Sequence, residues 1–440
     1  MNQRSASDQQ SISGTARLAI VNIGQLATLA DESDAPALRT GPRTRPRIGP
    51  AMRSLGLIAD AAMLVENGRI CATGRYADLR RQIPADATLI DADQRLVTPG
   101  FIDAHTHLAF AGNRAAEYEQ RIAGATYQQI AASGGGIQST VRLTRAATDA
   151  ELIAQTRRHR DWLLRGGTTT LEAKSGYGLN TETELRLLRT LAALNAEGSV
   201  RIVPTLLAAH TVPRELADYR AEYIRSILDD LLPIVARDGL ARFCDAFCDD
   251  HAFTVDECRT VLAAAARHGL GLRIHAEQFR PGTGAALAAE LRATTADHLE
   301  TIDDATIDLL RDAGVQPVLL PASAFCLSRA EYPPARLMID SGLAVVLATD
   351  FNPGSAPAPS MAFTLSLACL HMRMTPAEAL TAATINAAHS LGLADEIGSL
   401  VPGRQADFLL HEITDYRELP YFAAAPFRPR VFIAGREVTP

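Results

Sequence analysis

The chain has 440 residues, of which 47% are hydrophobic and 21% charged, and its formal net charge is −7. This apolar share excludes a wholly disordered chain, and the acidic balance argues against a protein that binds nucleic acid by neutralising phosphates. No run approaches the ~18 apolar residues of a membrane span. Six cysteines are too sparse for a disulfide framework, so we expect a soluble, cytoplasmic globular protein.

The N-terminal part is predicted to be a flexible tail followed by β-structure. Residues 1–14 are polar and lack the apolar stretch of a signal peptide. The run TARLAIVNIGQLATL is typical of a strand, and AAMLVENGRICATG predicts a hairpin around Asn67-Gly68. Between them, residues 31–56 are rich in Pro, Arg and Gly, which favours a long solvated loop.

From Pro99 onward, short apolar runs alternate with long helical patterns. Eight such strands over roughly 250 residues predict a (β/α)₈ TIM-like barrel, an α/β fold. The C-terminal part returns to β-structure and ends in a predicted hairpin, PRVFIAGREVTP. We expect a tail at 1–14, a composite β-sandwich domain from 15–98 and 393–440, and the barrel at 99–392. The eight candidate strands are GFIDAHTHLAF, GTTTLEAKSG, RIVPTLLAAH, ARFCDAFCD, GLRIHAEQ, RATTADHLE, VQPVLLPAS and LAVVLATDFN.

Four histidines and one aspartate fall at the ends of these strands. His105 and His107 are two residues apart on the first strand and so share a face. His275, His298 and Asp350 end the fifth, sixth and eighth strands. Barrel chemistry gathers at the C-terminal ends of the strands. His-x-His alone is more typical of two ordinary strand histidines, but the whole ring predicts a metal site with a position open for water.

A second cluster of possible ligands is better interpreted as packing. Cys244, Cys248, His251 and Cys258 lie within a short stretch, but their spacing does not match the paired motifs of structural zinc sites. Buried cysteines that act as small hydrophobic side chains are the preferred interpretation.

The strand-one motif GFIDAHTHL, together with the histidines of strands five and six and the aspartate of strand eight, resembles the amidohydrolase superfamily. Within it the chain is similar to the imidazolonepropionase family, over a range from Pro99 to about Gly392. AKSGYGL and ATDFNPGS are the most specific motifs. The matching stretches are HTHLAFAGNRAAEYEQR, SGGGIQSTV, TTLEAKSGYGL, LLAAHTVP, HAEQ, ADHLE, LATDFNPG and TINAAHSLG.

The resemblance implies hydrolysis of the cyclic amide C–N bond of 4-imidazolone-5-propanoate to N-formimidoyl-L-glutamate, a step of histidine degradation, by a metal-activated water. It also implies one Zn or Fe ion per subunit and a homodimer. The implied metal ligands are His105, His107, His275 and Asp350, with His298 and Asp350 as catalytic residues. The implied substrate contacts are Arg114, Tyr177, His210, Gln278, Asn352, Gly354 and Ser355.

These roles agree with the chemistry of the side chains. A guanidinium at Arg114 suits a substrate carboxylate, Asp350 can take a proton from water, and His298 can stabilise a developing oxyanion. Some relatives have a glutamate where this chain has Gln278, and glutamine cannot act as a base. For His210, packing is about as good an explanation as substrate binding.

The only lysine of the chain is Lys174, on the second predicted strand. Amidohydrolases with two metals commonly bridge them through a carboxylated lysine on strand four, but ARFCDAFCDD contains none. We therefore expect one metal. Lys174 is predicted to lie buried near the site and to pair with a carboxylate.

Two other functions remain open from the sequence. The first is an amidohydrolase or deaminase that acts on another heterocycle, which would have less need of a carboxylate-binding arginine. The second is a barrel that serves as a non-catalytic scaffold, although such relatives usually lose metal ligands.

Overall fold

The structure is a computed structural model that describes residues 17–30, 45–125, 129–130, 134–249, 252–422, 425–426 and 428–439. The predicted tail at 1–14, the first part of the predicted loop (31–44) and His251 lie outside the described residues.

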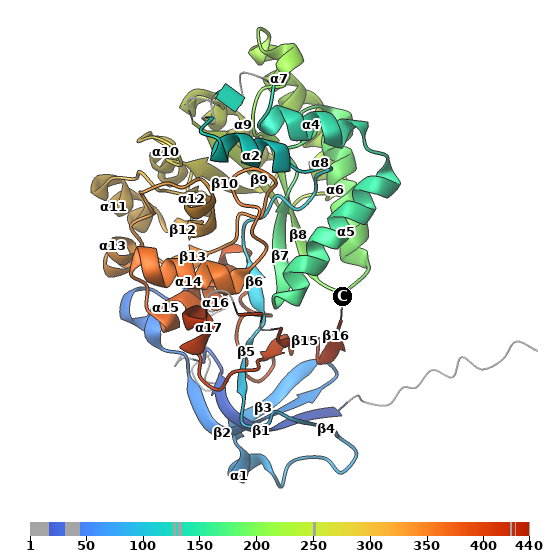
Figure 1. Cartoon of the computed structure of the whole chain (residues 1–440), viewed down its shortest axis with the longest axis vertical. Coiled ribbons are helices and arrows are strands. Elements are labelled where there is room, and N and C mark those ends of the chain that lie inside the picture. Colours follow the sequence, from blue (N-terminus) through green and yellow to red (C-terminus); the bar gives the residue numbers. More distant parts are fainter. Residues whose placement is uncertain are drawn as a thin grey trace, which may run out of the picture.

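Eight parallel strands form the barrel, as predicted, and each pairs with its neighbours in chain order (Figure 1). All residues of β7 and β9 are buried, because strands of a parallel barrel are covered on both faces. Both strands nevertheless carry charged residues, which must then find partners inside the protein. The strands are β6 (Phe101–Asp103), β7 (Thr168–Lys174), β8 (Arg201–Ala209), β9 (Phe243–Cys248), β10 (Gly271–Ala276), β11 (Thr295–His298), β12 (Gln316–Leu319) and β13 (Val346–Leu347).

The first and last barrel strands are shorter than their sequence runs predict. The carboxylate of Asp103, the last residue of β6, accepts hydrogen bonds from the backbone N (3.0 Å) and Oγ1 (2.6 Å) of Thr349, which follows β13, in place of a regular ladder. The two chain segments then meet again, because Asp350 N donates to His105 O (3.1 Å) and His107 N to Phe351 O (2.9 Å). The barrel is therefore closed by the same segments that carry three of the predicted metal ligands.

Helices follow the strands and surround the barrel (Figure 1). Three of them begin with a capping box, in which a threonine and a glutamate three residues later exchange hydrogen bonds: Thr148 with Glu151, Thr254 with Glu257, and Thr375 with Glu378. The helices are α2 (Ala115–Ile122), α4 (Ile137–Ala146), α5 (Asp149–Arg165), α6 (Thr181–Ala196), α7 (Arg220–Ser226), α8 (Leu232–Arg237), α9 (Val255–Arg267), α10 (Gly284–Glu290), α11 (Asp304–Ala313), α12 (Pro321–Cys326), α13 (Ala335–Asp340), α14 (Met361–Met372), α15 (Pro376–Ala382) and α16 (Ile385–Ser390), with short turns at η4 (Arg214–Leu216) and η5 (Ile227–Leu231).

Strands from both ends of the chain form the predicted composite domain, a mixed eight-stranded sheet below the barrel in Figure 1. The strand order is β16-β15-β14-β5-β1-β2-β3, and β4 also pairs with β1. This sheet has its own apolar core, in which the rings of Phe408 and Phe432 stack at 4.3 Å. Its elements are β1 (Arg17–Ala27), β2 (Leu57–Glu66), β3 (Arg69–Arg75), β4 (Thr88–Asp91), β5 (Leu96–Pro99), β14 (Phe408–Leu410), β15 (Arg430–Ile433) and β16 (Arg436–Val438), with short helices α1 (Tyr76–Leu79) and α17 (Glu418–Tyr421).

The prediction of a solvated loop is wrong for its described part, residues 45–56. This part contains the 3₁₀ helix η3 (Gly49–Arg53), and the side chain of Arg47 is almost fully buried. Its guanidinium donates to the carbonyls of Ser54 (2.8 Å) and Leu29, and its backbone N donates to Asn386 Oδ1 (2.8 Å). Backbone carbonyls thus replace water around the arginine, which composition alone does not reveal.

None of the described helices is long and apolar enough to cross a membrane.

Candidate metal centre

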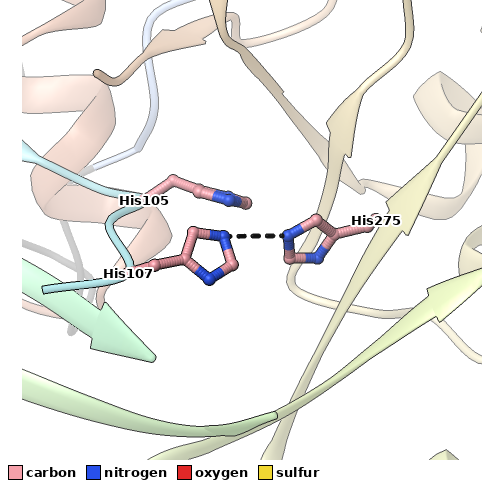
Figure 2. A group of neighbouring side chains, drawn as sticks. All are labelled: His105, His107 and His275. Carbon is pink, nitrogen blue, oxygen red and sulfur yellow. Dashed lines mark hydrogen bonds between the residues drawn. The ribbon is translucent and has the colours of Figure 1, made fainter. Parts of the chain in front are cut away.

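All four predicted ligands converge at the C-terminal ends of the barrel strands. His107 Nε2 lies 3.4 Å from His275 Nε2, and Asp350 Oδ1 lies 3.5 Å from Nε2 of both His105 and His107. Figure 2 shows the three imidazole rings approaching each other from opposite sides, His105 and His107 from one segment and His275 from β10. All four side chains are buried. The predicted convergence of these residues is confirmed.

The backbone turns sharply at the ends of the strands that precede or carry His298 and Asp350. His298 has a φ of 81° and Asp350 a φ of 54°, values in the left-handed region that residues other than glycine rarely adopt. Hydrogen bonds hold these conformations, from Leu299 N to Ala276 O (3.1 Å) and from Asp350 N to His105 O (3.1 Å). Such strain persists where surrounding structure over-determines it, which is common at functional sites.

Two buried carboxylates orient two of the histidines. Asp297 Oδ2 lies 2.6 Å from His105 Nδ1, and Asp245 Oδ1 lies 3.1 Å from His275 Nδ1. A proton on each Nδ1 then leaves the lone pair of Nε2 free to bind a metal, the arrangement that metal-binding histidines usually show.

The residues of this cluster fit a metal ion. Burial lowers the pKa of His105, His107 and His275, which favours the neutral imidazole that binds metals. Burial also raises the pKa of Asp350 to about 6. Within the described part of the chain, His105 Nε2 and Asp350 Oδ1 are buried without a hydrogen-bond partner. Three imidazole nitrogens and one carboxylate oxygen form a donor set typical of catalytic metal sites.

His298 lies beside this cluster, with its ring centroid 5.3 Å from that of His275. Its Nδ1 lies 3.5 Å from Glu300 Oε1, a contact between two side chains that are both about 2% exposed. Burial lowers the pKa of His298, but the nearby carboxylates of Glu300, Asp350 and Asp297 outweigh it, so the pKa lies above its ordinary value.

One pocket opens onto the cluster and is lined by most of the predicted substrate contacts. Burial lowers the pKa of His210 to about 3, and its ring stacks on that of His107 at 5.2 Å. Two of the predicted site residues are not part of the pocket lining: His105, which is fully buried, and Gly354, which directly precedes the lining residue Ser355. The lining residues are His107, Arg114, Ile137, Tyr177, His210, Phe247, His275, Gln278, Phe279, His298, Asp350, Asn352 and Ser355.

Arg114 is held in the wall of this pocket, at the N-terminal end of α2, and is 8% exposed. Its Nε donates to Thr140 Oγ1 (2.8 Å). A Cβ atom on Gly354 would lie only 2.2 Å from Arg114 Nη1, so this glycine leaves room for the guanidinium. The predicted position of Arg114 above the first strand is confirmed.

Asn352 shapes the loop that follows Asp350. Its Oδ1 accepts hydrogen bonds from the backbone N of Gly354 and of Ser355, both at 2.8 Å, and its Nδ2 donates to Asp350 O (2.7 Å) and Ser355 Oγ (2.9 Å). The side chain therefore ties the pocket wall to the strand end that carries Asp350.

Comparisons with known proteins bear on this site. The model of the amidohydrolase family matches residues 96–438, and that of the bacterial imidazolonepropionase-like composite domain matches residues 61–82. An imidazolonepropionase of Solibacter usitatus is 54% identical, covering 95% of this chain and 97% of that protein. The chain belongs to the imidazolonepropionase family of amidohydrolases.

Other members of the family match at lower identity. Imidazolonepropionase from Geobacillus kaustophilus is 44% identical, over 94% of this chain and 96% of that protein, and the one from Myxococcus xanthus is 46% identical, over 86% and 89%. Together, membership of the amidohydrolases and the histidine-rich cluster support a bound metal ion.

Solved structures share the fold at lower identity. A 5-methylcytosine deaminase from Klebsiella pneumoniae has a TM-score of 0.70 at 17% identity, over 96% of this chain and 97% of that one. A zinc-bound adenosine deaminase from Xanthomonas campestris has a TM-score of 0.66 at 19% identity, over 96% and 92%.

The sequence patterns do not predict a role for several residues that surround the predicted metal ligands and Arg114. They are the carboxylates Glu172, Asp245, Asp297 and Glu300, and Thr140 behind Arg114. One signal was present: Asp245 stands inside the apolar run FCDAFC, and a carboxylate in a strand covered on both faces must have a buried partner.

Two further predictions are confirmed by the contacts. Lys174 is fully buried and pairs with carboxylates. Cys244, Cys248 and Cys258 are buried free thiols, and among the described residues the possible metal-binding groups involve only the histidines and the aspartate of the main cluster.

Proposed function

We propose that this protein hydrolyses the ring C–N bond of 4-imidazolone-5-propanoate to give N-formimidoyl-L-glutamate, a step of histidine degradation. The observation that carries the proposal is the convergence of three imidazole nitrogens and the Asp350 carboxylate at the base of a pocket that also contains Arg114. The substrate has two groups that suit this pocket: a cyclic amide-like carbonyl, which suits the metal site, and a carboxylate, which suits Arg114.

The proposed metal ligands are His105, His107, His275 and Asp350, which hold one ion. When bound, a cation of this kind lowers the pKa of water to ~7 and polarises a carbonyl group. The donor set suits Zn and Fe alike, so we propose either ion.

Asp350 and His298 are the proposed catalytic residues. Beside a bound cation the Asp350 carboxylate would be ionised, and its free oxygen could accept a proton from the attacking water. The neighbouring Glu300 carboxylate favours the imidazolium form of His298, in which Nδ1 donates to Glu300 and Nε2 can donate a hydrogen bond to the carbonyl oxygen as negative charge develops there. Because Gln278 cannot accept a proton in this way, proton transfer rests on these two residues.

Arg114 is the proposed carboxylate-binding residue. A guanidinium that is 8% exposed, and fixed by Thr140 through Nε, offers its two Nη groups in the planar arrangement that matches a carboxylate. The remaining proposed substrate contacts are Tyr177, His210, Gln278, Asn352, Gly354 and Ser355, which lie on or beside the same pocket.

Product analysis tests the proposed function. Purified, metal-loaded protein should convert 4-imidazolone-5-propanoate to N-formimidoyl-L-glutamate without release of ammonia. A deaminase for another heterocycle, the alternative left open by the sequence, would release ammonia from a substrate without a carboxylate. No conversion of imidazolonepropionate by metal-replete protein would contradict the proposal.

We also propose a homodimer and a cytoplasmic location. The family resemblance supports the dimer, as do exposed apolar side chains on neighbouring helices, Leu370 on α14 and Tyr421 on α17. Six unpaired cysteines support a reducing compartment. Sedimentation of the purified protein as a monomer at micromolar concentration would contradict the dimer. The domain division stays as proposed from the sequence, with 15–98 and 393–440 forming one domain and 99–392 the other.

A further inference from the structure

The single lysine of this chain occupies an unusual place. The chain has 43 basic residues, and all but Lys174 are arginines. Lys174 ends β7, is 0% exposed, and lies among carboxylates beneath the proposed metal site. A position that holds the only lysine among so many arginines is one where the shape of the cation matters.

The ammonium of Lys174 faces three carboxylates on three different strands. Its Nζ lies 2.8 Å from Glu172 Oε1, 2.8 Å from Asp245 Oδ2 and 3.8 Å from Asp297 Oδ2. All four side chains have no exposed surface. Because buried charges are costly unless they are paired, the four groups depend on one another.

Each of these carboxylates supports a segment that carries a proposed ligand. Asp297 contacts His105 Nδ1 (2.6 Å), and Asp245 contacts His275 Nδ1 (3.1 Å). Glu172 Oε2 accepts a hydrogen bond from Thr106 N (3.2 Å), the residue between His105 and His107. One ammonium is therefore connected, through three carboxylates, to the positions of all three histidines.

An arginine does not fit this role. An ammonium has three hydrogen-bond donors around a single tetrahedral nitrogen, whereas a guanidinium presents its donors in one plane. The other buried cation here, Arg273, is used differently. Its Nε lies 3.9 Å from Asp297 Oδ2, so it supports one of the three carboxylates, but the rest of its guanidinium lies over the ring of Phe243 at 5.0 Å and donates through Nη2 to Ala104 O (3.1 Å). Within the described part of the chain it forms no ion pair with the other two carboxylates, both of which Lys174 contacts.

We propose that Lys174 is a positioning residue that joins Glu172, Asp245 and Asp297 and thereby fixes His105, His107 and His275 in the orientation that binds the metal. This inference rests on the ligand set of the proposed function. Lys174 itself is expected to touch neither the substrate nor the metal. Its effect is on the affinity of the site for the ion.

Metal affinity provides the test. Apparent Kd values for Zn²⁺ are measured by competition with a chromogenic chelator, on full-length wild-type protein and on the variants Lys174→Met and Lys174→Arg. Lys174→Met should weaken Zn²⁺ binding by about 10–100-fold, the usual cost of losing a group that orients metal ligands. Lys174→Arg keeps the charge but not the geometry, so its Kd should stay at least several-fold above wild type.

A control separates this effect from general destabilisation. Glu378→Gln removes a buried carboxylate paired with Arg53 and Arg336, away from the site, and should lower stability while leaving the Zn²⁺ affinity unchanged. A Lys174→Met protein that folds and binds Zn²⁺ with the wild-type Kd would overturn the inference. If wild-type protein binds no metal, the proposed function fails together with the inference; if wild-type protein binds Zn²⁺ and Lys174→Met binds it equally well, the inference alone fails.

The wild-type protein offers a second measurement in case the variants do not fold. Labelling with ¹³Cε-lysine gives a single side-chain resonance, because Lys174 is the only lysine. That resonance should shift when Zn²⁺ is added to metal-stripped protein, since the charge of the ion polarises the histidines and, through them, the carboxylates that contact the ammonium. A resonance unchanged by stoichiometric Zn²⁺ would contradict the proposed connection.

Discussion

Replacement of Arg114 by alanine should weaken substrate binding much more than it slows the reaction of bound substrate. In the structure the guanidinium is nearly buried in the pocket wall, and its hydrogen bond to Thr140 uses Nε alone. The two Nη groups remain for the substrate carboxylate. Binding of a carboxylate remote from the reacting carbonyl stabilises ground state and transition state alike, so its loss raises KM.

The size of the effect follows from the bonds lost. Two charge-assisted hydrogen bonds contribute about 1.5–3 kcal/mol each, and a conservative total of about 3 kcal/mol corresponds to roughly a 100-fold increase in KM. Arg114→Lys keeps the charge without the fork and should raise KM by about tenfold. Gly354→Ala should also raise KM, because the new Cβ would lie 2.2 Å from Arg114 Nη1 and displace the guanidinium.

Steady-state kinetics with 4-imidazolone-5-propanoate checks this prediction, with Arg142→Ala as the matched control. Arg142 is an exposed arginine on α4, the helix that carries Thr140, and its loss should leave KM unchanged. An unchanged KM for Arg114→Ala, or a fall in kcat as large as the fall in kcat/KM, would refute the role of this guanidinium.

Two other substitutions test catalysis and stability. His298→Asn should lower kcat by about 100-fold or more with little change in KM, because the hydrogen bond to the developing oxyanion is made only in the transition state; a normal kcat would remove His298 from the mechanism. Glu378→Gln should lower the free energy of unfolding by about 2 kcal/mol, measured by urea denaturation near pH 7. Burial raises the pKa of Glu378, but hydrogen bonds from Arg336, Thr375 and Arg53 outweigh it and lower the pKa from 4.5 to about 2. The contribution of the ionised Glu378 carboxylate to the free energy of unfolding is therefore present above pH 4.5 and is lost as the pH falls toward 2. The difference in unfolding free energy between wild type and variant should shrink over that interval. A difference that stays constant with pH would contradict the ionic role of Glu378.

The sequence predicts the barrel well because its signal is repetitive. Apolar runs that alternate with helical patterns favour a barrel of parallel strands surrounded by helices. In such a barrel the C-terminal ends of all strands lie at one rim. His275 and His298 could be assigned to that rim because they stand late in clear strands. His105, His107 and Asp350 were placed there correctly, although they lie beyond the ends of β6 and β13.

The surroundings of the ligands were harder to predict. Whether Asp245 and Asp297 face a histidine or a neighbouring helix depends on which strands are adjacent and in what register, and this is set by the whole barrel. The same holds for Arg47. It stands in a Pro- and Arg-rich segment, whose composition favours exposure to solvent, but in the structure its side chain is buried and donates hydrogen bonds to backbone carbonyls. Long-range partners of polar groups leave no periodic signal in a single sequence.

Metal content and hydrolytic activity, determined on the same purified sample, test whether the histidine cluster holds a catalytic metal. We expect about one Zn or Fe ion per chain, loss of imidazolonepropionate hydrolysis when a chelator removes it, and recovery when the divalent ion is restored. Persistent turnover in fully stripped protein would contradict the assignment of His105, His107, His275 and Asp350 as ligands of a catalytic metal.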